Sequence, residues 1–447
     1  MPNKIRFGQQ LPVTIESQRM LTRSAGLIPA HTQTLAKGPG QYSKGVCPAY
    51  LVKGKGALVW DIDGNQYLDY SMGVGPISLG YCYPAVDEAI RNQLENGITF
   101  SLMHPLEVEV AELIRDIVPH TESVRFSKTG ADVTSAAVRL ARAYTGRSNV
   151  FCCGYHGWHD WYISVTDRNT GIPVSTKDLT HTFSYNNIQS VIDGIDNDTA
   201  AIILEPMVVE EPRNNFLQDL RSICSDRGII LIFDEMWTGF RLALGGAQEY
   251  FGVRADLCTF SKAIANGMPL SVLTGRREIM NLLEEEVFFF TTFGGETLSL
   301  AAAKATIMEL MKQRVPEDLA IKGKQLQSSI NSIAQLRGMD YLRCVGEPCR
   351  TMIAISPSAG DPLEIKTFIQ QELLRNGILW SGFHNLCYSH TLEDIEYTIQ
   401  AYGEVLTVLD NAVRCGKVRS LLQGKVLEPV FRRTGNFNIK PKVAVAV

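Results

Sequence analysis

Short runs of apolar residues alternate with longer amphipathic segments in the middle of the chain. Between residues 123 and 276 the apolar runs include "SVRFS", "NVFCCG", "AAIILEP", "IILIFDE", "ADLCTFS" and "LSVLTGR". The segments between them, such as "TSAAVRLARAYTG" and "LQDLRSICSDRG", have the apolar spacing of a helix. Strands that are apolar throughout and alternate with helices predict a parallel sheet covered on both faces. We therefore predict an α/β fold.

The pattern changes on both sides of this region. Residues 24–48 are rich in Gly, Ser, Thr and Pro, which predicts an irregular arm. The stretch "ALVWDIDGNQYLDYS" alternates apolar and polar residues around Asp63 and Gly64, which predicts a hairpin. Its acidic residues also suggest a calcium loop, but the ligand spacing and closing glutamate of an EF-hand are missing. After about residue 300 a long helix, "SLAAAKATIMELMKQ", leads into helices mixed with short strands.

These changes divide the chain into three parts. We expect residues 1–84 to form an N-terminal segment, made of the arm and part of a small domain. Residues 85–325 would form a large domain, and residues 326–447 the rest of the small domain and a tail. A chain of 447 residues is long enough for two such lobes.

Composition excludes several classes of protein. Hydrophobic residues at 45% and charged residues at 20% are ordinary for a globular chain, and a net charge of −4 argues against binding of nucleic acid. No apolar run is long enough to span a membrane, and the N-terminus lacks the apolar core of a signal peptide. Ten cysteines without a repeating spacing are typical of reduced thiols. We therefore expect a cytoplasmic protein that binds neither nucleic acid nor membrane.

Two charged residues follow buried strands. Asp234 ends "IILIFD", and Lys262 follows "LCTFS" after an intervening segment long enough for a helix and a further strand. Taken singly, the lysine could extend to water from a strand end and the aspartate could cap a helix. Since parallel strands end at one edge of a sheet, where such folds bind ligands, we expect the two side chains to lie together there.

Two turns that precede helices offer hydrogen-bond donors. Thr129, Gly130 and Ala131 lie between the strand "SVRFS" and a predicted helix, whose free N–H groups could hold a phosphate or could simply be capped. Thr292, in "FFFTTFGGETLSLAAA", precedes another helix and could bind phosphate or start that helix. A nicotinamide cofactor fits poorly, because "GVGPISLG" holds only part of the dinucleotide fingerprint.

The stretch "CCGYHGWHD" combines aromatic and metal-binding residue types. Tyr155 and His156 could present an aromatic face to a flat ligand, or Tyr155 could belong to the core. Cys152, Cys153, His156 and His159 also suggest a zinc site, but structural zinc usually takes ligand pairs from separated segments. We therefore expect no metal.

Together these features are a phosphate site, an aromatic plate, a buried carboxylate and a lysine. Pyridoxal phosphate (PLP) needs all four, because its phosphate needs donors, its ring needs stacking, its pyridine nitrogen needs a carboxylate and its aldehyde needs an amine.

From about residue 53 to 310 the sequence resembles the class III aminotransferases of PLP fold type I, in particular the branch around glutamate-1-semialdehyde aminomutase. The resemblance lies in "WDIDGNQYLDYSMGVGPISLGY", "AAVRLARAYTGR", "GYHGWHD", "IFDEMWTGFR", "GGAQEYFGV", "FSKAIANGMPLSVLTGR" and "TFGGETLSLAAA". It implies a large domain with a mostly parallel seven-stranded sheet between helices, and a smaller α+β domain built from the N-terminal segment and the C-terminal part.

The resemblance also implies roles for individual residues. Lys262 would form the Schiff base with PLP and move the proton, and Asp234 would pair with the pyridinium. Tyr155, in the stretch shared with His156, would stack on one ring face and Met236 would pack on the other. The phosphate site would be the turn Thr129-Gly130-Ala131. Thr292 would reach the cofactor of the neighbouring subunit, which implies a homodimer with shared active sites.

Three departures from the family pattern stand out. The aminomutase phosphate turn usually reads Ser-Gly-Thr-Glu-Ala, whereas this chain has Thr-Gly-Ala-Asp-Val. After Glu205-Pro206 the family has a Gly-rich turn with an amide side chain near the phenolic oxygen of the cofactor, and "MVVEEPRNN" has no such turn. "GGET" replaces the usual "GGNP" or "SGNP". These changes indicate a sister group with its own substrate.

The function that we predict is that of a PLP-dependent aminotransferase, with L-glutamate as the expected amino donor and a small aldehyde or keto compound as the acceptor. Glutamate-1-semialdehyde 2,1-aminomutase and a PLP-dependent epimerase remain alternatives. Arg241 could bind a substrate carboxylate or be purely structural, and His31 and Lys37 in the arm are expected to border the pocket. Segment 160–181 resembles the mobile lid of related enzymes.

Overall fold

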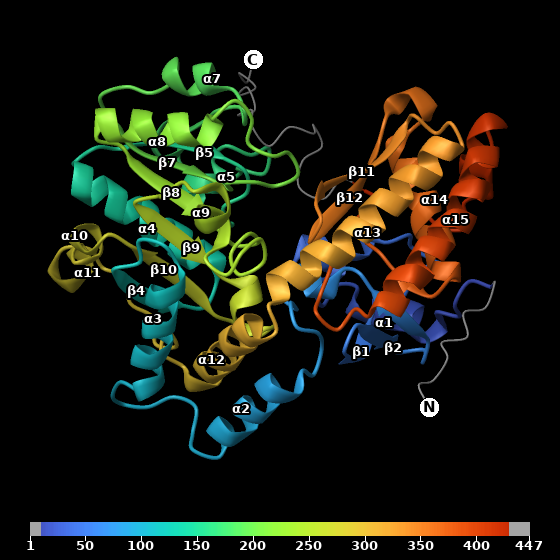
Figure 1. Cartoon of the computed structure of the whole chain (residues 1–447), viewed down its shortest axis with the longest axis horizontal. Coiled ribbons are helices and arrows are strands. Elements are labelled where there is room, and N and C mark those ends of the chain that lie inside the picture. The colour runs from blue at the N-terminus through green and yellow to red at the C-terminus, as the bar shows by residue number, and fades with distance from the viewer. Residues whose placement is uncertain (1–9, 429–447) are drawn as a thin grey trace. The chain divides into compact units, whose positions relative to one another are not determined.

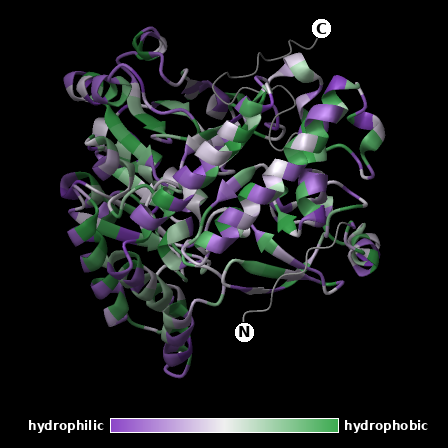
Figure 2. Cartoon of the chain, turned by 45° about the vertical axis from the view of Figure 1, so that its right-hand side comes forward, coloured by the Kyte–Doolittle hydropathy of each residue, from purple (hydrophilic) through white to green (hydrophobic). Residues whose placement is uncertain are grey.

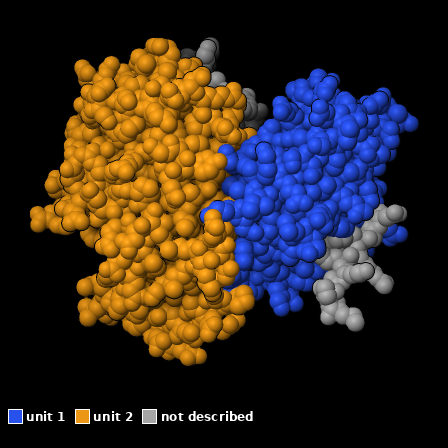
Figure 3. Space-filling view, in the orientation of Figure 1, with its two compact units in different colours: residues 1–83, 317–431 blue, residues 84–316, 432–447 orange. Residues whose placement is uncertain are grey.

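The computed structural model describes residues 10–428 of the chain, which divide into two compact units (Figure 3). Of the described residues, one unit holds 84–316, and the other combines 10–83 with 317–428. The second unit is therefore discontinuous in sequence.

The unit 84–316 is built on a seven-stranded sheet (Figure 1). Its strands lie in the order β4 (Ser123–Ser127), β10 (Ser271–Gly275), β9 (Leu257–Phe260), β8 (Ile230–Asp234), β7 (Thr199–Leu204), β5 (Asn149–Cys153) and β6 (Thr180–Thr182). Strand β10 pairs antiparallel with both neighbours, and the other pairs are parallel. The predicted α/β fold with a mostly parallel sheet is confirmed.

Helices surround this sheet. The longer ones are α2 (Pro84–Leu94), α3 (Pro105–Ile117), α4 (Gly130–Thr145), α8 (Phe216–Arg227) and α12 (Thr297–Lys312). The shorter ones are α5 (Asp160–Ile163), α6 (Val174–Asp178), α7 (Ile188–Ile192), α9 (Gly246–Phe251), α10 (Arg277–Met280) and α11 (Leu282–Glu285). In α4, apolar residues at helical spacing join buried strand residues in one core. Figure 2 shows that hydrophobic residues concentrate in the strands, whereas the helices also carry hydrophilic stretches.

The expected lid, residues 160–181, is partly embedded in that core. Trp161 and Tyr162 of α5 are 7% and 1% exposed, and Val165 is fully buried. Two large aromatic side chains therefore anchor its first part, and the mobility of the segment stays a prediction.

The other unit holds two smaller sheets. The first contains β1 (Leu51–Lys55), β2 (Leu58–Asp61), β3 (Gln66–Asp69) and β13 (Ile378–Leu379), and the second contains β11 (Leu342–Glu347), β12 (Arg350–Ile355) and β14 (Phe383–Asn385). Its helices are α1 (Ile15–Ser24), α13 (Val315–Leu336), α14 (Pro362–Arg375) and α15 (Leu392–Arg414). Because β13 pairs with β3, the N-terminal and C-terminal segments share a sheet, as predicted for the smaller α+β domain.

The acidic hairpin has a structural role. Strands β2 and β3 pair antiparallel, and Gly64 in the turn has φ of +87°. The carboxylate of Asp63 accepts hydrogen bonds from Glu16 N at 2.7 Å and Ser17 N at 2.9 Å, at the start of α1. The hairpin is confirmed, and Asp63 stabilises the first turn of a helix.

Within residues 10–428, no helix has both the length and the apolar character that crossing a membrane requires. The predicted tail lies mostly outside the described residues.

Candidate active site

The polar residues that follow β5, β7, β8 and β9 meet at one edge of the large sheet. The register pairs Cys153 with Leu204, Leu204 with Phe233, and Asp234 with Thr259. The next residues along these strands therefore lie side by side, at the carboxyl end where α/β folds bind ligands.

Asp234 is held in a buried pair with His156. Its Oδ2 lies 2.8 Å from His156 Nδ1, both side chains are about 1% exposed or less, and Oδ1 accepts a hydrogen bond from Met236 N at 3.1 Å. The second ring nitrogen, Nε2, lies 3.2 Å from the carbonyl oxygen of Cys153. Both ring nitrogens of His156 therefore have a hydrogen-bond partner.

Glu205, directly after β7, brings a second carboxylate to this edge. Its Oε1 accepts a hydrogen bond from Tyr155 N at 2.7 Å. Burial and the charge of Asp234 raise the pKa of Glu205, whereas the Tyr155 N–H, His156 and Lys262 act to lower it. Asp234, His156, Glu205 and Lys262 are therefore close enough to interact electrostatically.

Lys262 follows β9 in an unusual backbone conformation. Its φ is +44°, and it begins the short 3-10 helix Lys262–Ala265. Ser261 Oγ donates a hydrogen bond to Leu270 O at 2.7 Å, which fixes the residue before it. Positive φ values at residues other than glycine are uncommon and concentrate at functional sites. The side chain of Lys262 is half-buried.

The turn at the start of α4 is a complete capping box. Thr129 Oγ1 accepts from Asp132 N at 3.4 Å, and Asp132 Oδ2 accepts from Thr129 N at 2.8 Å and from Ser127 Oγ at 2.9 Å. Burial by itself would raise the pKa of Asp132, but these hydrogen bonds outweigh it and the pKa is lowered. In the described residues, the N–H groups of Gly130 and Ala131 have no acceptor. The turn therefore retains two donors for an anion.

Two glycines allow the turns of this region to approach closely. A β-carbon at Gly130 would lie 2.8 Å from Met236 Sδ, and one at Gly157, where φ is +101°, would lie 2.7 Å from Ala131 Cβ. Thr134 Oγ1 donates to His156 O at 2.9 Å. Helix α4, the 154–157 turn and Met236 are therefore packed together.

Tyr155 is 41% exposed and meets Tyr162 edge to face, with ring centroids 5.6 Å apart. Tyr162 OH donates to Gly154 O at 2.8 Å, which holds the turn before Tyr155.

The two histidines of the zinc site considered above, His156 and His159, are hydrogen-bonded to other side chains. His156 pairs with Asp234, and His159 Nδ1 lies 2.7 Å from Ser135 Oγ, which also accepts from Trp161 Nε1 at 2.9 Å. No set of three or more His, Cys, Asp and Glu side chains in the described part of the chain could hold a metal ion.

Thr292 lies in an exposed turn, and the helix that follows is capped by an ion pair that the sequence did not reveal. Glu296 accepts hydrogen bonds from Leu298 N at 2.7 Å and Ser299 N at 3.3 Å, and binds Lys128 Nζ at 2.9 Å. Lys128 directly precedes Thr129. This ion pair thus connects the phosphate-type turn to the start of α12.

Arg241 is 1% exposed and is among the largest fully buried side chains. His31 Nδ1 lies 2.8 Å from Ser24 Oγ in the other unit.

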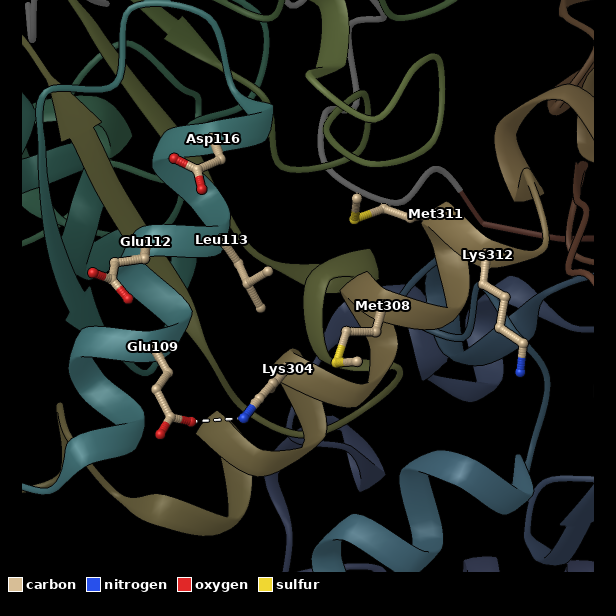
Figure 4. Close-up of a pocket in the computed structure, with 8 residues that line it drawn as sticks. All are labelled: Glu109, Glu112, Leu113, Asp116, Lys304, Met308, Met311 and Lys312. Atoms are coloured by element: carbon tan, nitrogen blue, oxygen red, sulfur yellow. Dashed lines mark hydrogen bonds and ion pairs between the residues drawn. The ribbon is translucent and has the colours of Figure 1, made fainter.

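A cavity of the unit 84–316 lies away from these residues. It is a surface groove of about 720 Å³ between α3 and α12, and its apolar lining residues are Leu113, Met308 and Met311 (Figure 4). Lys304 Nζ and Glu109 Oε2, which also line the groove, form an ion pair at 2.7 Å. None of the predicted site residues lines it. The chemistry-bearing groups therefore do not coincide with the groove.

Comparison with known proteins gives consistent matches over nearly the whole chain. Residues 41–394 match the family described as Aminotransferase class-III. The chain is 33% identical to the 3-aminobutyryl-CoA aminotransferase of Cloacimonas acidaminovorans, over 91% of this chain and 98% of that protein. It is 34% identical to the glutamate-1-semialdehyde 2,1-aminomutase of Methanothermobacter thermautotrophicus, over 89% of this chain and all of that protein.

Among solved structures, the PLP internal aldimine form of the FumI protein from a Sphingopyxis species has a TM-score of 0.83. It is 26% identical in sequence and the match covers 91% of this chain and 98% of that one. The likeness thus extends across both units.

Proposed function

The chain belongs to the class-III aminotransferase family, and from this premise we propose that it transfers an amino group from an amino-acid donor, with L-glutamate the first to test, to a small aldehyde or keto acceptor. Enzymes of this family use PLP, which is therefore the cofactor of this chain. PLP supplies an aldehyde that bonds amino groups and a pyridinium ring that accepts electrons released at the substrate α-carbon.

The donors and acceptors at the sheet edge fit this cofactor. The N–H groups of Gly130 and Ala131 have no acceptor in the described residues, and a phosphate at a helix N-terminus would satisfy them. Thr129 would add a hydroxyl. Because Asp132 is engaged with Thr129 N and Ser127, its negative charge is already compensated. We therefore assign the phosphate site to Thr129, Gly130 and Ala131.

Lys262 is our proposed covalent and acid–base residue. Its amine would bond the aldehyde carbon of the cofactor and, once released, carry the proton between the substrate and the cofactor. Support comes from its place after β9, its positive φ and its electrostatic interaction with Glu205.

Asp234 is proposed to hold the proton on the pyridine nitrogen. A buried carboxylate that already binds His156 through one oxygen keeps its orientation, and its negative charge favours a protonated ring nitrogen nearby. His156 would orient the Asp234 carboxylate through the hydrogen bond between them. Tyr155 would stack on one face of the ring and Met236 on the other, which the contact between Met236 and Gly130 supports.

A homodimer would complete the site. Thr292 is exposed, and near it in the chain Phe288, Phe290 and Phe293 are 73%, 55% and 56% exposed. Exposed aromatic side chains in one segment are typical of an interface. We propose that a second copy covers this segment and that its cofactor phosphate receives the hydroxyl of Thr292.

Arg241 is proposed to be structural, because a guanidinium that is 1% exposed is not open to a substrate. We also propose a cytoplasmic location, which the cysteine thiols support.

The observation that carries the proposal is that Glu205, Asp234 and Lys262 gather at the carboxyl ends of three adjacent strands, together with the helix turn with two unused N–H groups. The test is to purify the protein with PLP and to screen amino donors. We expect L-glutamate alone to change the visible absorbance of the cofactor and to release one equivalent of 2-oxoglutarate per site.

The aminomutase is the second candidate, because a relative of that name is 34% identical over its full length. An aminomutase would convert glutamate-1-semialdehyde without net release of a keto acid. An epimerase would exchange the α-hydrogen of its substrate with deuterium from solvent and would also release none. Absence of the corresponding keto acid with every amino donor would overturn the aminotransferase proposal.

A further inference from the structure

The carboxyl of Glu205 is half-buried, and the proposed reaction assigns it no role. It lies directly after β7, between the strands that lead to His156 and Asp234 (Figure 1). Leu204 pairs with Cys153 on one side and with Phe233 on the other. Glu205 is therefore level with Gly154 and Asp234 in the row that the cofactor would face.

The backbone around Glu205 fixes this carboxyl in place. A β-carbon at Gly154 would lie 2.8 Å from Glu205 Oε1 and 3.1 Å from its Cγ, and Gly154 has φ of +108°. Only glycine combines that conformation with such a close approach. Oε1 then accepts the hydrogen bond of 2.7 Å from Tyr155 N, whereas Oε2 has no hydrogen-bond partner in the described residues.

The ionisable groups that face Glu205 come from three neighbouring strands. Asp234 comes from the end of β8, and Lys262 comes from the turn after β9. The end of β5 and the turn after it supply Cys153, Tyr155 and His156. Asp234 is already paired with His156 at 2.8 Å. Lys262 is a further group whose positive charge acts on the carboxylate of Glu205.

We propose that Glu205 is a positioning residue for the reaction, which holds the Tyr155 turn through Oε1 and keeps the nitrogen of Lys262 protonated through its negative charge. The inference rests on the proposed function, since it concerns the nitrogen of Lys262 when that nitrogen is bonded to PLP. It has two separable parts, a mechanical one at Tyr155 and an electrostatic one at Lys262.

The electrostatic part has a definite sign. A negative charge near a cationic nitrogen raises the pKa of that nitrogen, so its loss lowers it. Glu205→Gln keeps the shape and the acceptor for Tyr155 N but removes the charge. We expect the pH midpoint of the visible absorbance change of the PLP-loaded protein to fall by about one unit, that is, about tenfold in the protonation equilibrium.

The experiment compares four PLP-loaded proteins by absorbance titration and by the dissociation constant of PLP. Glu205→Gln should lower the midpoint with nearly unchanged PLP affinity. Glu205→Asp should retain the wild-type midpoint, because the charge remains, but should bind PLP more weakly, because the shorter side chain no longer holds Tyr155 N. Asp219→Asn, an exposed residue on α8, removes one charge from the same unit and should change neither quantity.

Equal midpoints in the wild type and in Glu205→Gln would overturn the electrostatic part, whatever the activities are. Unchanged PLP affinity in Glu205→Asp would overturn the mechanical part. Failure of the proposed function is distinguishable, because a wild-type protein without the absorbance of lysine-bound PLP would have no midpoint to compare.

Discussion

Each unit of the molecule contains a buried cluster of ionisable side chains, and the two clusters differ in how their polar atoms are satisfied. In the discontinuous unit, His384 Nδ1 lies 2.9 Å from Thr351 Oγ1 and Nε2 lies 2.7 Å from Tyr402 OH. His390 Nδ1 accepts from Cys387 N at 3.0 Å, and Nε2 lies 3.1 Å from Asp69 O. Each ring nitrogen therefore has a neutral partner.

In the cluster at the edge of the large sheet, the ionisable side chains instead have other ionisable side chains as neighbours. Asp234 faces His156, and Glu205 and Lys262 bring a further negative and a further positive group. Oε2 of Glu205 and the N–H groups of Gly130 and Ala131 have no hydrogen-bond partner in residues 10–428. Burial of ionisable groups is thus common to both units, whereas unused donors and acceptors beside several charges distinguish the candidate active site.

The largest effect expected is that of Lys262→Ala. Removal of the amine should lower the rate of amino transfer by about a thousandfold or more, because general acid–base catalysis alone contributes about 10²–10⁴-fold. The free energy of unfolding should change by less than about 1 kcal/mol. Steady-state kinetics and urea unfolding test the two statements, and substantial activity in the variant would refute the assignment.

Asp234→Asn should have the next largest effect. Asparagine can keep the hydrogen bond from Met236 N but cannot stabilise a positive ring nitrogen, so we expect a loss of at least about a hundredfold in kcat. His156 would then face a neutral amide. Measurement of kcat with saturating PLP separates this loss from weaker cofactor binding, and a kcat within a few fold of the wild type would contradict the role of the charge.

The histidines of the discontinuous unit should affect stability rather than catalysis. Burial lowers the pKa of His384 to about 3, below its ordinary value of 6.5. As the pH falls through 6.5 the unfolded chain gains a proton that the folded chain does not, so this group costs about 2 kcal/mol of stability between pH 7 and pH 5. Urea unfolding should show that His384→Gln loses less stability over this range than the wild type.

Parallel losses in the two proteins would contradict this difference. Amino transfer at pH 7 serves as the control, and we expect it to be the same in His384→Gln and in the wild type whenever both are folded.

The smallest effect should come from the groove between α3 and α12. Lys304 and Glu109 form an ion pair of 2.7 Å with side chains 39% and 43% exposed. Solvent screening limits such a pair to at most about 1 kcal/mol, so Lys304→Met should leave both the unfolding midpoint and kcat nearly unchanged. A large loss of activity would place the chemistry in the groove rather than at the sheet edge.

Much of this fold was predictable because it follows from local pattern. The apolar strands β5, β7, β8 and β9 were each visible as short runs, and their parallel pairing aligns the ends that carry Asp234 and Lys262. The reversed direction of β10 was not visible, since its sequence resembles that of its parallel neighbours. The anchoring of residues 160–165 was missed, although Trp161, Tyr162 and Val165 have the apolar spacing of a buried turn.

The site was less predictable because partners depend on register. The sequence offered His156 as part of an aromatic face or a zinc ligand, and nothing local indicates its bond to Asp234, 78 residues away. Glu205 has the same sequence pattern as Asp234, an acid directly after an apolar run, but the pattern alone assigned it no role. The pair between Lys128 and Glu296 was hidden because the two residues lie 168 positions apart in the chain.

The contact between Gly157 and Ala131 has a consequence for engineering this protein. Because a β-carbon at 157 would lie 2.7 Å from that of Ala131, the two turns behave as interlocking parts. Mutant libraries that randomise either turn alone would sample mostly misfitting combinations. Screening for new substrates should instead diversify both turns jointly, or leave them fixed and vary residues elsewhere.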